Sequence, residues 1–236
     1  TAATGTSTVV NGIRISGGLA NNVYNNLIGG LTAPAAASVD AIRGISITSS
    51  TALSTQKIYG NTVYLNAASS GANFGSTGLF HTYSATATTS ALDMRNNIIV
   101  NASSAAGTGF AVAFRRSAAT DLANYATTSN NNLFFGTSGV YTNGAATYAF
   151  GPFQTLVSTR ETASRNQNPS FASTTGANAT FLHFVADAIN LAGANGQVIA
   201  GYTTDFDGET RDASTPDIGA DEWVNGVISL PTVASF

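Results

Sequence analysis

Hydrophobic positions in the first half of the chain form short stretches, and each stretch follows the same polar residue. Asparagine, any residue, and then Ile, Val or Phe occurs at Asn26, Asn61, Asn97 and Asn132, with spacings of 35, 36 and 35 residues. A fixed period of this size is typical of repeat architectures. Asparagine is a poor strand former, but it tolerates the left-handed backbone of a sharp corner. The pattern therefore predicts one corner and one short buried strand in each repeat.

A second recurring segment begins with glycine followed by an apolar residue. It occurs at Gly12, Gly44, Gly78 and Gly109, with spacings of 32, 34 and 31 residues. Each repeat is therefore predicted to hold two short strands separated by a variable loop. Apolar and polar residues alternate in these strands, which buries one face. No segment shows sustained helical periodicity, and no capped apolar run reaches ten residues.

These patterns divide the chain into three parts. Residues 1–136 are predicted to form parallel β-helix coils with a repeat of about 35 residues. Residues 137–223 lose the period, and we expect them to form the final coils and a C-terminal cap. Residues 224–236 are apolar and are predicted to be a terminal strand or a linker. Because the chain begins within a repeat, we expect a longer parent protein.

The composition excludes several classes of partner. Only 9% of residues are charged and 43% are hydrophobic, which suits stacked strands better than an ordinary solvated surface. The net charge is −3 and Lys57 is the single lysine, which argues against a nucleic-acid partner. No apolar run is long enough for membrane insertion. The chain has no cysteine, so it has neither a disulfide framework nor a thiolate metal site.

Repeats and closing motifs together resemble a known family. The segments are "NNLFFG", "NPSF", "FLHFVADAINLAG" and "TDFDGETR…PDIGADEW", in that order. They resemble the right-handed parallel β-helix of the pectate-lyase-like superfamily, and in particular the closing region of proteins that Bacteroidetes export by the type IX route. The resemblance covers nearly the whole chain and implies a secreted or cell-surface location. One departure, at residues 186–190, replaces the family's Ser-Pro-Ala-Ile-Asn and affects a local turn.

The fold that this resemblance implies hosts lyases, hydrolases, esterases, adhesins and passive stalks, so function has to be argued from candidate sites. The recurring asparagines are expected to be structural. Stacked amides at successive corners would hydrogen-bond along the solenoid axis and satisfy buried backbone groups. The same role is expected for the asparagines directly before them, which are Asn25, Asn96 and Asn131.

Seven of the twelve carboxylates lie in residues 201–223. We expect this segment to act as a cap, in which Asp205 or Asp207 accepts hydrogen bonds from turn amides and Arg211 pairs with a carboxylate. Trp223 is predicted to cover the open end of the core. The predicted cap residues are Asp205, Asp207, Arg211, Asp217, Glu222 and Trp223. The alternative is a calcium ion held by Asp205, Asp207 and Glu209, although the spacing of an EF-hand is incomplete.

Catalysis is the sharper hypothesis. A β-helix lyase needs a base and a cation that neutralises the uronate carboxylate. We expect His81 at the surface or in a loop, and no basic residues at matching positions on adjacent coils. The candidate bases are Lys57, His81, Arg115, Arg116 and His183, of which the arginine pair is expected in a solvated turn.

A hydrolase of this fold needs two or three clustered carboxylates. The repeat region offers only Asp40, Asp93 and Asp121, which is a weak basis for hydrolysis. Asp93 and Arg95 alternate along one predicted strand, so they share a face and are expected to pair.

Aromatic side chains offer a further candidate site. Tyr24 and Tyr59 each stand two residues before a repeated asparagine, and Tyr64 lies close by. Stacked on an outer face they would bind sugar rings. In the alternative, they pack against the neighbouring coil as ordinary strand aromatics.

Three functional hypotheses follow. The first is a non-catalytic module of a large exported surface protein, structural or adhesive, in contact with extracellular polysaccharide. Its partners would be neighbouring modules of a longer chain or other copies joined end to end. The second is a lyase-like enzyme that acts on acidic glycans, and the third is a glycan-binding module without catalysis. Clustered basic residues would favour the lyase, and exposed aligned aromatics would favour the binding module.

Overall fold

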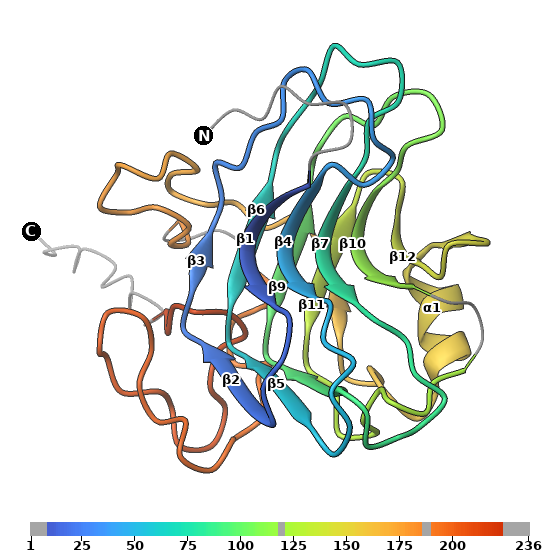
Figure 1. Cartoon of the computed structure of the whole chain (residues 1–236). Coiled ribbons are helices and arrows are strands. Elements are labelled where there is room, and N and C mark those ends of the chain that lie inside the picture. The colour runs from blue at the N-terminus through green and yellow to red at the C-terminus, as the bar shows by residue number, and fades with distance from the viewer. Residues whose placement is uncertain (1–8, 118–120, 186–189, 224–236) are drawn as a thin grey trace, which may run out of the picture.

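The computed structural model describes residues 9–117, 121–185 and 190–223, and its main body is a parallel β-solenoid of about four turns (Figure 1). This confirms the predicted all-β solenoid. Predictions for residues 186–189 and 224–236, and for the start of the chain, lie outside the described residues. The described part contains no helix that is long and apolar enough to span a bilayer.

Three sheets form the walls of the solenoid. The first contains β1 (Val10–Ile15), β4 (Ile42–Ile47), β7 (Ser76–His81), β10 (Ala111–Arg116), β12 (Gly139–Thr142) and β13 (Thr147–Tyr148), in that order. The second contains β2 (Ala20–Tyr24), β5 (Thr55–Tyr59) and β8 (Ala91–Arg95). The third contains β14 (Arg165–Asn166), β11 (Leu133–Gly136), β9 (Ile98–Asn101), β6 (Thr62–Leu65) and β3 (Leu27–Ile28). Neighbouring strands are parallel, apart from the β12–β13 pair.

Each of the first three coils contributes one strand to every sheet, so a coil has three strands where the sequence pattern predicted two. The strand that was missed belongs to the second sheet. In β2 the outward positions Ala20, Asn22 and Tyr24 are exposed and carry no strongly apolar side chain, so the strand carries little hydrophobic signal. In the fourth coil this wall continues as two isolated bridges, Leu92 to Tyr125 and Arg95 to Asn130.

The glycine pattern gave the correct register for three coils and the wrong one for the fourth. Leu79 pairs with Phe114, so the residue opposite Gly78 is Ala113 and not Gly109. Gly109 lies in the preceding turn, where a Cβ atom would collide with the Phe74 carbonyl. Position 109 therefore needs glycine because the backbone of Phe74 passes close to it, outside the strand.

The hydrophobic core fills the inside of the solenoid. Inward side chains stack in ranks along the axis, because residues in register on parallel strands point to the same side. The ranks are Ile45, Leu79 and Phe114 in the first sheet, Ile58 and Met94 in the second, and Val63, Ile99 and Phe134 in the third. All of these side chains are fully buried.

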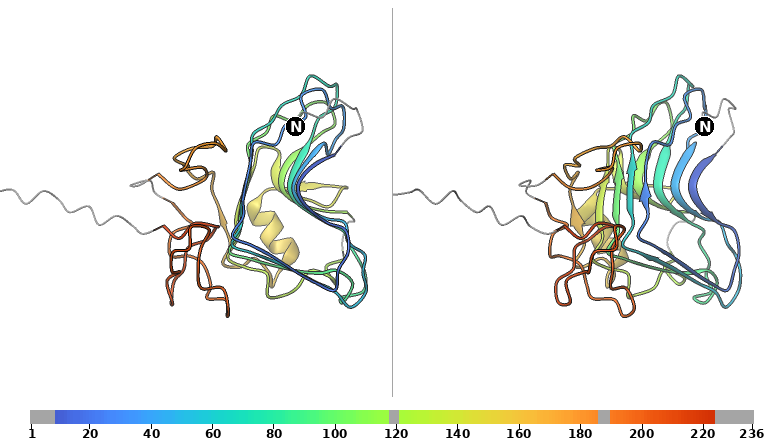
Figure 2. Two further views of the ribbon diagram at one scale, coloured as in Figure 1. Left: turned by 60° about the vertical axis from the view of Figure 1, so that its left-hand side comes forward. Right: turned by 90° about the vertical axis from the view of Figure 1, so that its left-hand side faces the viewer.

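A short helix closes the C-terminal end of this core. α1 (Phe150–Val157) lies beyond β12 at the end of the solenoid (Figures 1 and 2). Its buried Phe153 ring stacks on Tyr141, with ring centroids 5.0 Å apart, and meets Phe134 edge-on at 5.6 Å. The sequence showed no sign of this helix, because eight residues that include Gly151 and Pro152 are too few to show a helical period.

The C-terminal segment lies beside the solenoid and does not close its end (Figure 2). Phe184, Ala192 and Ile218 cover an outward apolar cluster on the third sheet, which consists of Ile98, Val100 and Leu133. Trp223 belongs to this outer layer, where its ring meets Phe184 edge-on at 6.3 Å. The prediction that Trp223 covers the open end of the core therefore places it wrongly. The outward residues of β9 are apolar, so a covering layer is needed at the side.

Candidate functional site

The four repeated asparagines form a ladder of amides along the axis. Asn26 Nδ2 donates to Asn61 Oδ1 at 2.8 Å, Asn61 Nδ2 to Asn97 Oδ1 at 2.9 Å, and Asn97 Nδ2 to Asn132 Oδ1 at 2.9 Å. Each of the last three also donates to a backbone carbonyl in the second-sheet strand of the preceding coil, as Asn97 does to Ile58 at 2.8 Å. The side-chain oxygens of Asn61, Asn97 and Asn132 also each accept a backbone N–H from the preceding coil. The ladder therefore satisfies buried polar groups that the corner would otherwise leave unpaired.

A buried carboxyl group ends this ladder. Asn132 Nδ2 donates to Glu161 Oε2 at 2.9 Å, and the hydroxyls of Tyr125 and Ser164 also donate to Glu161. Burial raises the pKa of Glu161, and the three hydrogen-bond donors act against that shift. The last amide of the ladder needs only an acceptor for its N–H group, and a carboxylate supplies one. Sequence reasoning missed Glu161 because it comes 29 residues after Asn132, outside the period.

The residues just before the ladder make the sharp turn itself. Asn25, Asn96 and Asn131 have φ values of 54°, 54° and 56°, and Gly60 has 52°. In this left-handed region asparagine and glycine are the preferred residues. Adjacent asparagines therefore have two different roles, in which the first turns the chain and the second stacks in the ladder.

The turning residues also dock the C-terminal segment. Asn25 Nδ2 donates to the carbonyl of Thr204 at 2.8 Å, Asn96 Nδ2 to that of Gln197 at 2.8 Å, and Asn131 Nδ2 to that of Asn195 at 2.8 Å. At Gly60, which has no side chain, the Tyr202 hydroxyl fills the gap, 3.2 Å from the Gly60 carbonyl and 2.6 Å from Asn25 Oδ1. One rank of corners thus acts as the attachment strip for residues 195–205.

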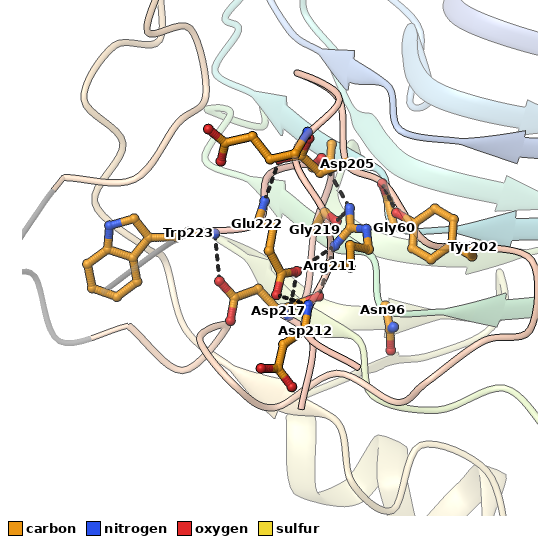
Figure 3. A network of polar contacts seen from close by, with 12 residues as sticks. Gly60, Asn96, Tyr202, Asp205, Arg211, Asp212, Asp217, Gly219, Glu222 and Trp223 are labelled. Carbon is orange, nitrogen blue, oxygen red and sulfur yellow. Dashed lines mark hydrogen bonds and ion pairs between the residues drawn. The ribbon is translucent and has the colours of Figure 1, made fainter. Parts of the chain in front are cut away.

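The acidic motif forms a closed network within that segment (Figure 3). Asp205 accepts the N–H groups of Asp207 at 3.0 Å, Glu209 at 2.8 Å and Glu222 at 2.9 Å. Its two oxygens are thus already occupied by turn amides, which disfavours the calcium alternative at this residue. Glu209 is exposed.

Arg211 lies at the centre of this network. Its guanidinium pairs with Glu222 at 3.2 Å, donates to the Gly219 carbonyl at 2.8 Å and lies 4.4 Å from the centroid of the Tyr202 ring. Asp217 accepts the Trp223 N–H at 2.7 Å, and burial raises the pKa of Asp217 to about 6. The predicted cap residues, apart from Asp207, therefore bind one another and the backbone of the C-terminal segment.

Two candidate bases are buried inside the turn after the first sheet. His81 and Arg116 end β7 and β10 and pair in register, and neither is exposed. The predictions of a surface histidine, of a solvated arginine turn and of no matching basic positions were all wrong here. The error in the fourth glycine hid the match, because a correct register places Arg116 opposite His81.

The side chains of this buried pair contact only other parts of the fold in the hydrogen bonds that follow. Arg116 Nη1 donates to the Asp121 carbonyl at 2.6 Å and Nη2 donates to Asn124. Burial and the charge of Arg116 lower the pKa of His81 to about 3, so the ring is neutral. Its Nε2 lies 2.9 Å from the carbonyl of Ser90. Neither side chain reaches solvent, so neither can act on a polymer.

Arg115 and Arg43 share one carboxylate, that of Asp40. Arg115 Nη1 lies 2.6 Å from Asp40 Oδ2 and Arg43 Nη2 lies 2.7 Å from it, while Thr77 Oγ1 donates to the other oxygen at 2.7 Å. This buried carboxylate ties together side chains from three coils. It also occupies two of the chain's cationic groups.

The outer face of the second sheet carries a row of larger side chains. Tyr24, Tyr59 and Arg95 are in register on successive strands, and so are Asn22, Lys57 and Asp93. Asp93 and Arg95 pair at 2.7 Å, as predicted. Tyr59 donates its hydroxyl to Asp93 at 2.7 Å, and burial together with Asp93 raises the pKa of Tyr59.

A groove of about 250 Å³ lies between this row and residues 199–202. Its lining includes Asn22, Tyr24, Lys57 and Tyr59, and Tyr24 meets Tyr202 edge-on at 6.0 Å. Tyr24 remains 54% exposed. Tyr64 is not part of the groove, because it lies on the third sheet under Phe171 at 5.6 Å.

A second groove, of about 270 Å³, lies on the outer face of the first sheet and is lined by Arg14, Arg43, Ser46 and Thr48 among others. Sequence reasoning missed both arginines, because their positions in the two coils differ and only the folded side chains converge. Arg43 Nη1 donates to Ser46 at 3.2 Å, and Arg14 stands opposite Ser46 in register.

His183 is the last candidate base and lies in the C-terminal segment beside Asp207. The distance from His183 Nε2 to Asp207 Oδ2 is 2.7 Å. Burial lowers the pKa of His183, but the hydrogen bonds to Asp207 and Phe181 and the charges of Asp221 and Asp207 together outweigh it, and the net pKa is raised. Comparison of the chain with models of protein families, with curated proteins and with solved structures finds no match to any of them.

Proposed function

We propose that this chain is a non-catalytic β-helix module of an exported surface protein of the pectate-lyase-like type, and that it contacts acidic extracellular polysaccharide through the groove of Tyr24, Lys57 and Tyr59. The observation that carries the proposal is this groove, where an aligned tyrosine pair and a cationic side chain face solvent together. Secretion or display at the cell surface is part of the proposal, since such polysaccharides are extracellular.

The groove has the chemistry of a sugar site. Tyrosine rings stack against the apolar faces of sugar rings, while polar groups at the rim bind hydroxyl or carboxylate oxygens. Asn22 and Lys57 supply those donors on the same two coils. Within the described residues Lys57 makes no ion pair, so its charge is available to a uronate carboxylate.

Five of the eight remaining cationic groups support a scaffold role. Arg43 and Arg115 are engaged by Asp40, Arg95 by Asp93 and Arg211 by Glu222, and Arg116 is buried. Side chains held in this way stabilise the coils.

The two ends of the solenoid differ, which bears on the proposed partners. α1 closes the C-terminal end. At the other end, no strand within the described residues pairs with the outer edges of β1, β2 and β3. The core residues Val10, Ile13 and Val23 are only partly covered there. The proposed partner at this edge is another coil, from a neighbouring module or from a second copy.

Binding of oligogalacturonate, measured by calorimetry, tests the glycan proposal. We expect saturable binding that Lys57→Gln and Tyr24→Ala each weaken by about tenfold, equivalent to about 1.4 kcal/mol. Methyl-esterified oligogalacturonate, which lacks the charge, should discriminate less between wild type and Lys57→Gln. Arg14→Gln removes a cation from the other groove and is the matched control. If wild type fails to bind acidic and neutral oligosaccharides, or if only Arg14→Gln matters, the proposed groove is refuted.

A lyase that acts on acidic glycans is the second candidate, favoured by one observation. Arg14 and Arg43 line a common groove with Ser46 and Thr48, which gives two guanidinium groups near one cleft. A lyase would release an unsaturated uronate whose ultraviolet absorbance is easily followed. We expect no such product from polygalacturonate. Formation of the product, and its loss in Arg14→Ala, would instead establish the lyase.

A further inference from the structure

One cluster in the C-terminal segment takes no part in the proposed glycan contact. His183, Asp207 and Asp221 come from separate stretches of chain, and one nitrogen or oxygen of each lies within 4.8 Å of the others. We propose that these three side chains form a divalent metal site with the preference of zinc, which pins the 181–184 stretch to the acidic closing motif.

The orientation of the histidine ring is set by the backbone. His183 Nδ1 lies 3.0 Å from the carbonyl of Phe181 and donates its hydrogen there. The other nitrogen, Nε2, therefore faces the carboxylates, at 2.7 Å from Asp207 Oδ2. A ligand histidine that donates its second nitrogen to a carbonyl is the usual arrangement at protein metal sites. Without a metal, a proton occupies the space between Nε2 and Asp207.

The carboxylates supply the remaining charge. Asp221 is only 7% exposed, while the side chain of Asp207 is 42% exposed, so the site is anchored on one side and open on the other. Asp205 also lies close enough to act on Asp221 electrostatically, and the neighbouring Arg211 is already paired with Glu222. The cluster thus has an excess of negative charge, which a dication neutralises.

Distances and donor types favour zinc over calcium. Zinc bonds of about 2 Å place two ligand atoms no more than about 4 Å apart, so a small movement closes the site. One imidazole and two carboxylates suit zinc and related transition metals, whereas calcium takes six to eight oxygens. The open side leaves a position for water.

The site would act as a cross-link between two parts of the segment. Phe181 and Phe184 bridge back to Ser173 and Phe171, so His183 lies on a small paired unit. Asp207 and Asp221 belong to the closing motif, which is docked on the corner residues. A metal held by all three would join the paired unit to the docked motif.

The test uses the tag-free chain after chelator treatment, titrated with zinc by calorimetry and with Co²⁺ by visible absorption. We expect one ion per chain, with affinity reduced about tenfold or more by His183→Gln, Asp207→Asn and Asp221→Asn. Asp207→Asn alters an exposed group, so it remains informative if the buried variant fails to fold. Glu209→Gln, an exposed carboxylate in the same motif, is the matched control. The other histidine of the chain, His81, is buried, so a cobalt–imidazole spectrum reports on His183.

Three results would overturn the site. One is the absence of saturable zinc binding to wild type. Another is binding that all three variants retain. The last is a site that prefers calcium and depends on Glu209, which would restore the calcium alternative. Because the glycan groove contains none of these residues, loss of oligogalacturonate binding with zinc binding intact refutes only the proposed function, and the reverse refutes only the metal site.

Discussion

The amide ladder predicts that the cost of removing one asparagine depends on its place in the ladder. Asn97 lies in the interior, where its side chain donates to Asn132 and Ile58 and accepts two hydrogens from Asn61. Asn97→Ala removes the partner of the buried Asn61 N–H and of the Ile58 carbonyl. A buried polar group left without a partner costs about 1–3 kcal/mol, so the two together cost about 2–6 kcal/mol. That is a large part of the 5–15 kcal/mol of a typical domain.

Asn26 provides the matched control at the end of the same ladder. Its side chain is partly exposed and donates to the Tyr24 carbonyl and to Asn61 Oδ1. After Asn26→Ala, water reaches the first group, and Asn61 Oδ1 still accepts the backbone N–H of residue 26. We therefore expect a loss of only about 0.5–1.5 kcal/mol, the net value of an ordinary hydrogen bond.

Urea unfolding followed by far-ultraviolet circular dichroism measures both variants. The midpoint should fall much further for Asn97→Ala than for Asn26→Ala, with similar slopes against urea concentration, because the buried surface is nearly unchanged. Equal losses in the two variants would show that the corner stabilises the fold only locally, and that stacking of amides along the axis contributes nothing.

Three further predictions concern other parts of the molecule. Phe153→Ala should destabilise the fold by about 3–5 kcal/mol in the same unfolding assay, because it leaves a cavity at the closed end of the core. The folded pKa of His81, about 3, lies below the usual 6.5, so the stability that the neutral ring contributes is complete above pH 6.5 and is lost as the pH falls from 6.5 towards 3, by about 5 kcal/mol in all. His81→Asn should therefore reduce the pH dependence of the free energy of unfolding over that range. An unchanged pH dependence would contradict the buried neutral ring. In Gly60→Ala the new methyl group collides with the Tyr202 hydroxyl at a left-handed position, so limited proteolysis should cut residues 195–205 faster, whereas Gly151→Ala, which meets open space, should leave the rate unchanged.

The solenoid was predictable from the sequence because its corners have strict requirements. A left-handed turn and a buried amide accept few residue types, so asparagine recurs at a nearly constant spacing. Strands of the second sheet carry no comparable requirement. Their outward faces meet solvent or the groove and tolerate polar residues such as Asn22 and Lys57. The second-sheet strand of each coil therefore gave no clear sequence pattern.

The roles of the charged residues were harder to predict, because they depend on register between coils. Arg116 meets His81 across 35 residues, and Arg115 meets Asp40 across 75. Gly109 lies four residues before Ala113, the position that pairs with Gly78. Because of this difference, the sequence predicted a surface turn where the structure has a buried pair. The acidic motif shows the same limit in another form. Its spacing indicates carboxylates that bind turn amides, but the surface on which the motif docks is set by apolar residues of β9 and β11.

The direction of the ladder sets which end of the solenoid can be extended. Each amide donates towards the C-terminus, from Asn26 through Asn61 and Asn97 to Asn132, and the last donor meets the carboxyl group of Glu161. A carboxylate has no hydrogen to pass on, so the ladder ends there, at the same level where α1 closes the core. At the opposite end Asn26 Oδ1 can accept a hydrogen from an asparagine one coil earlier. The same rule that joins the four coils would therefore join a fifth, but only at the edge formed by β1, β2 and β3, so growth of this solenoid has one polarity.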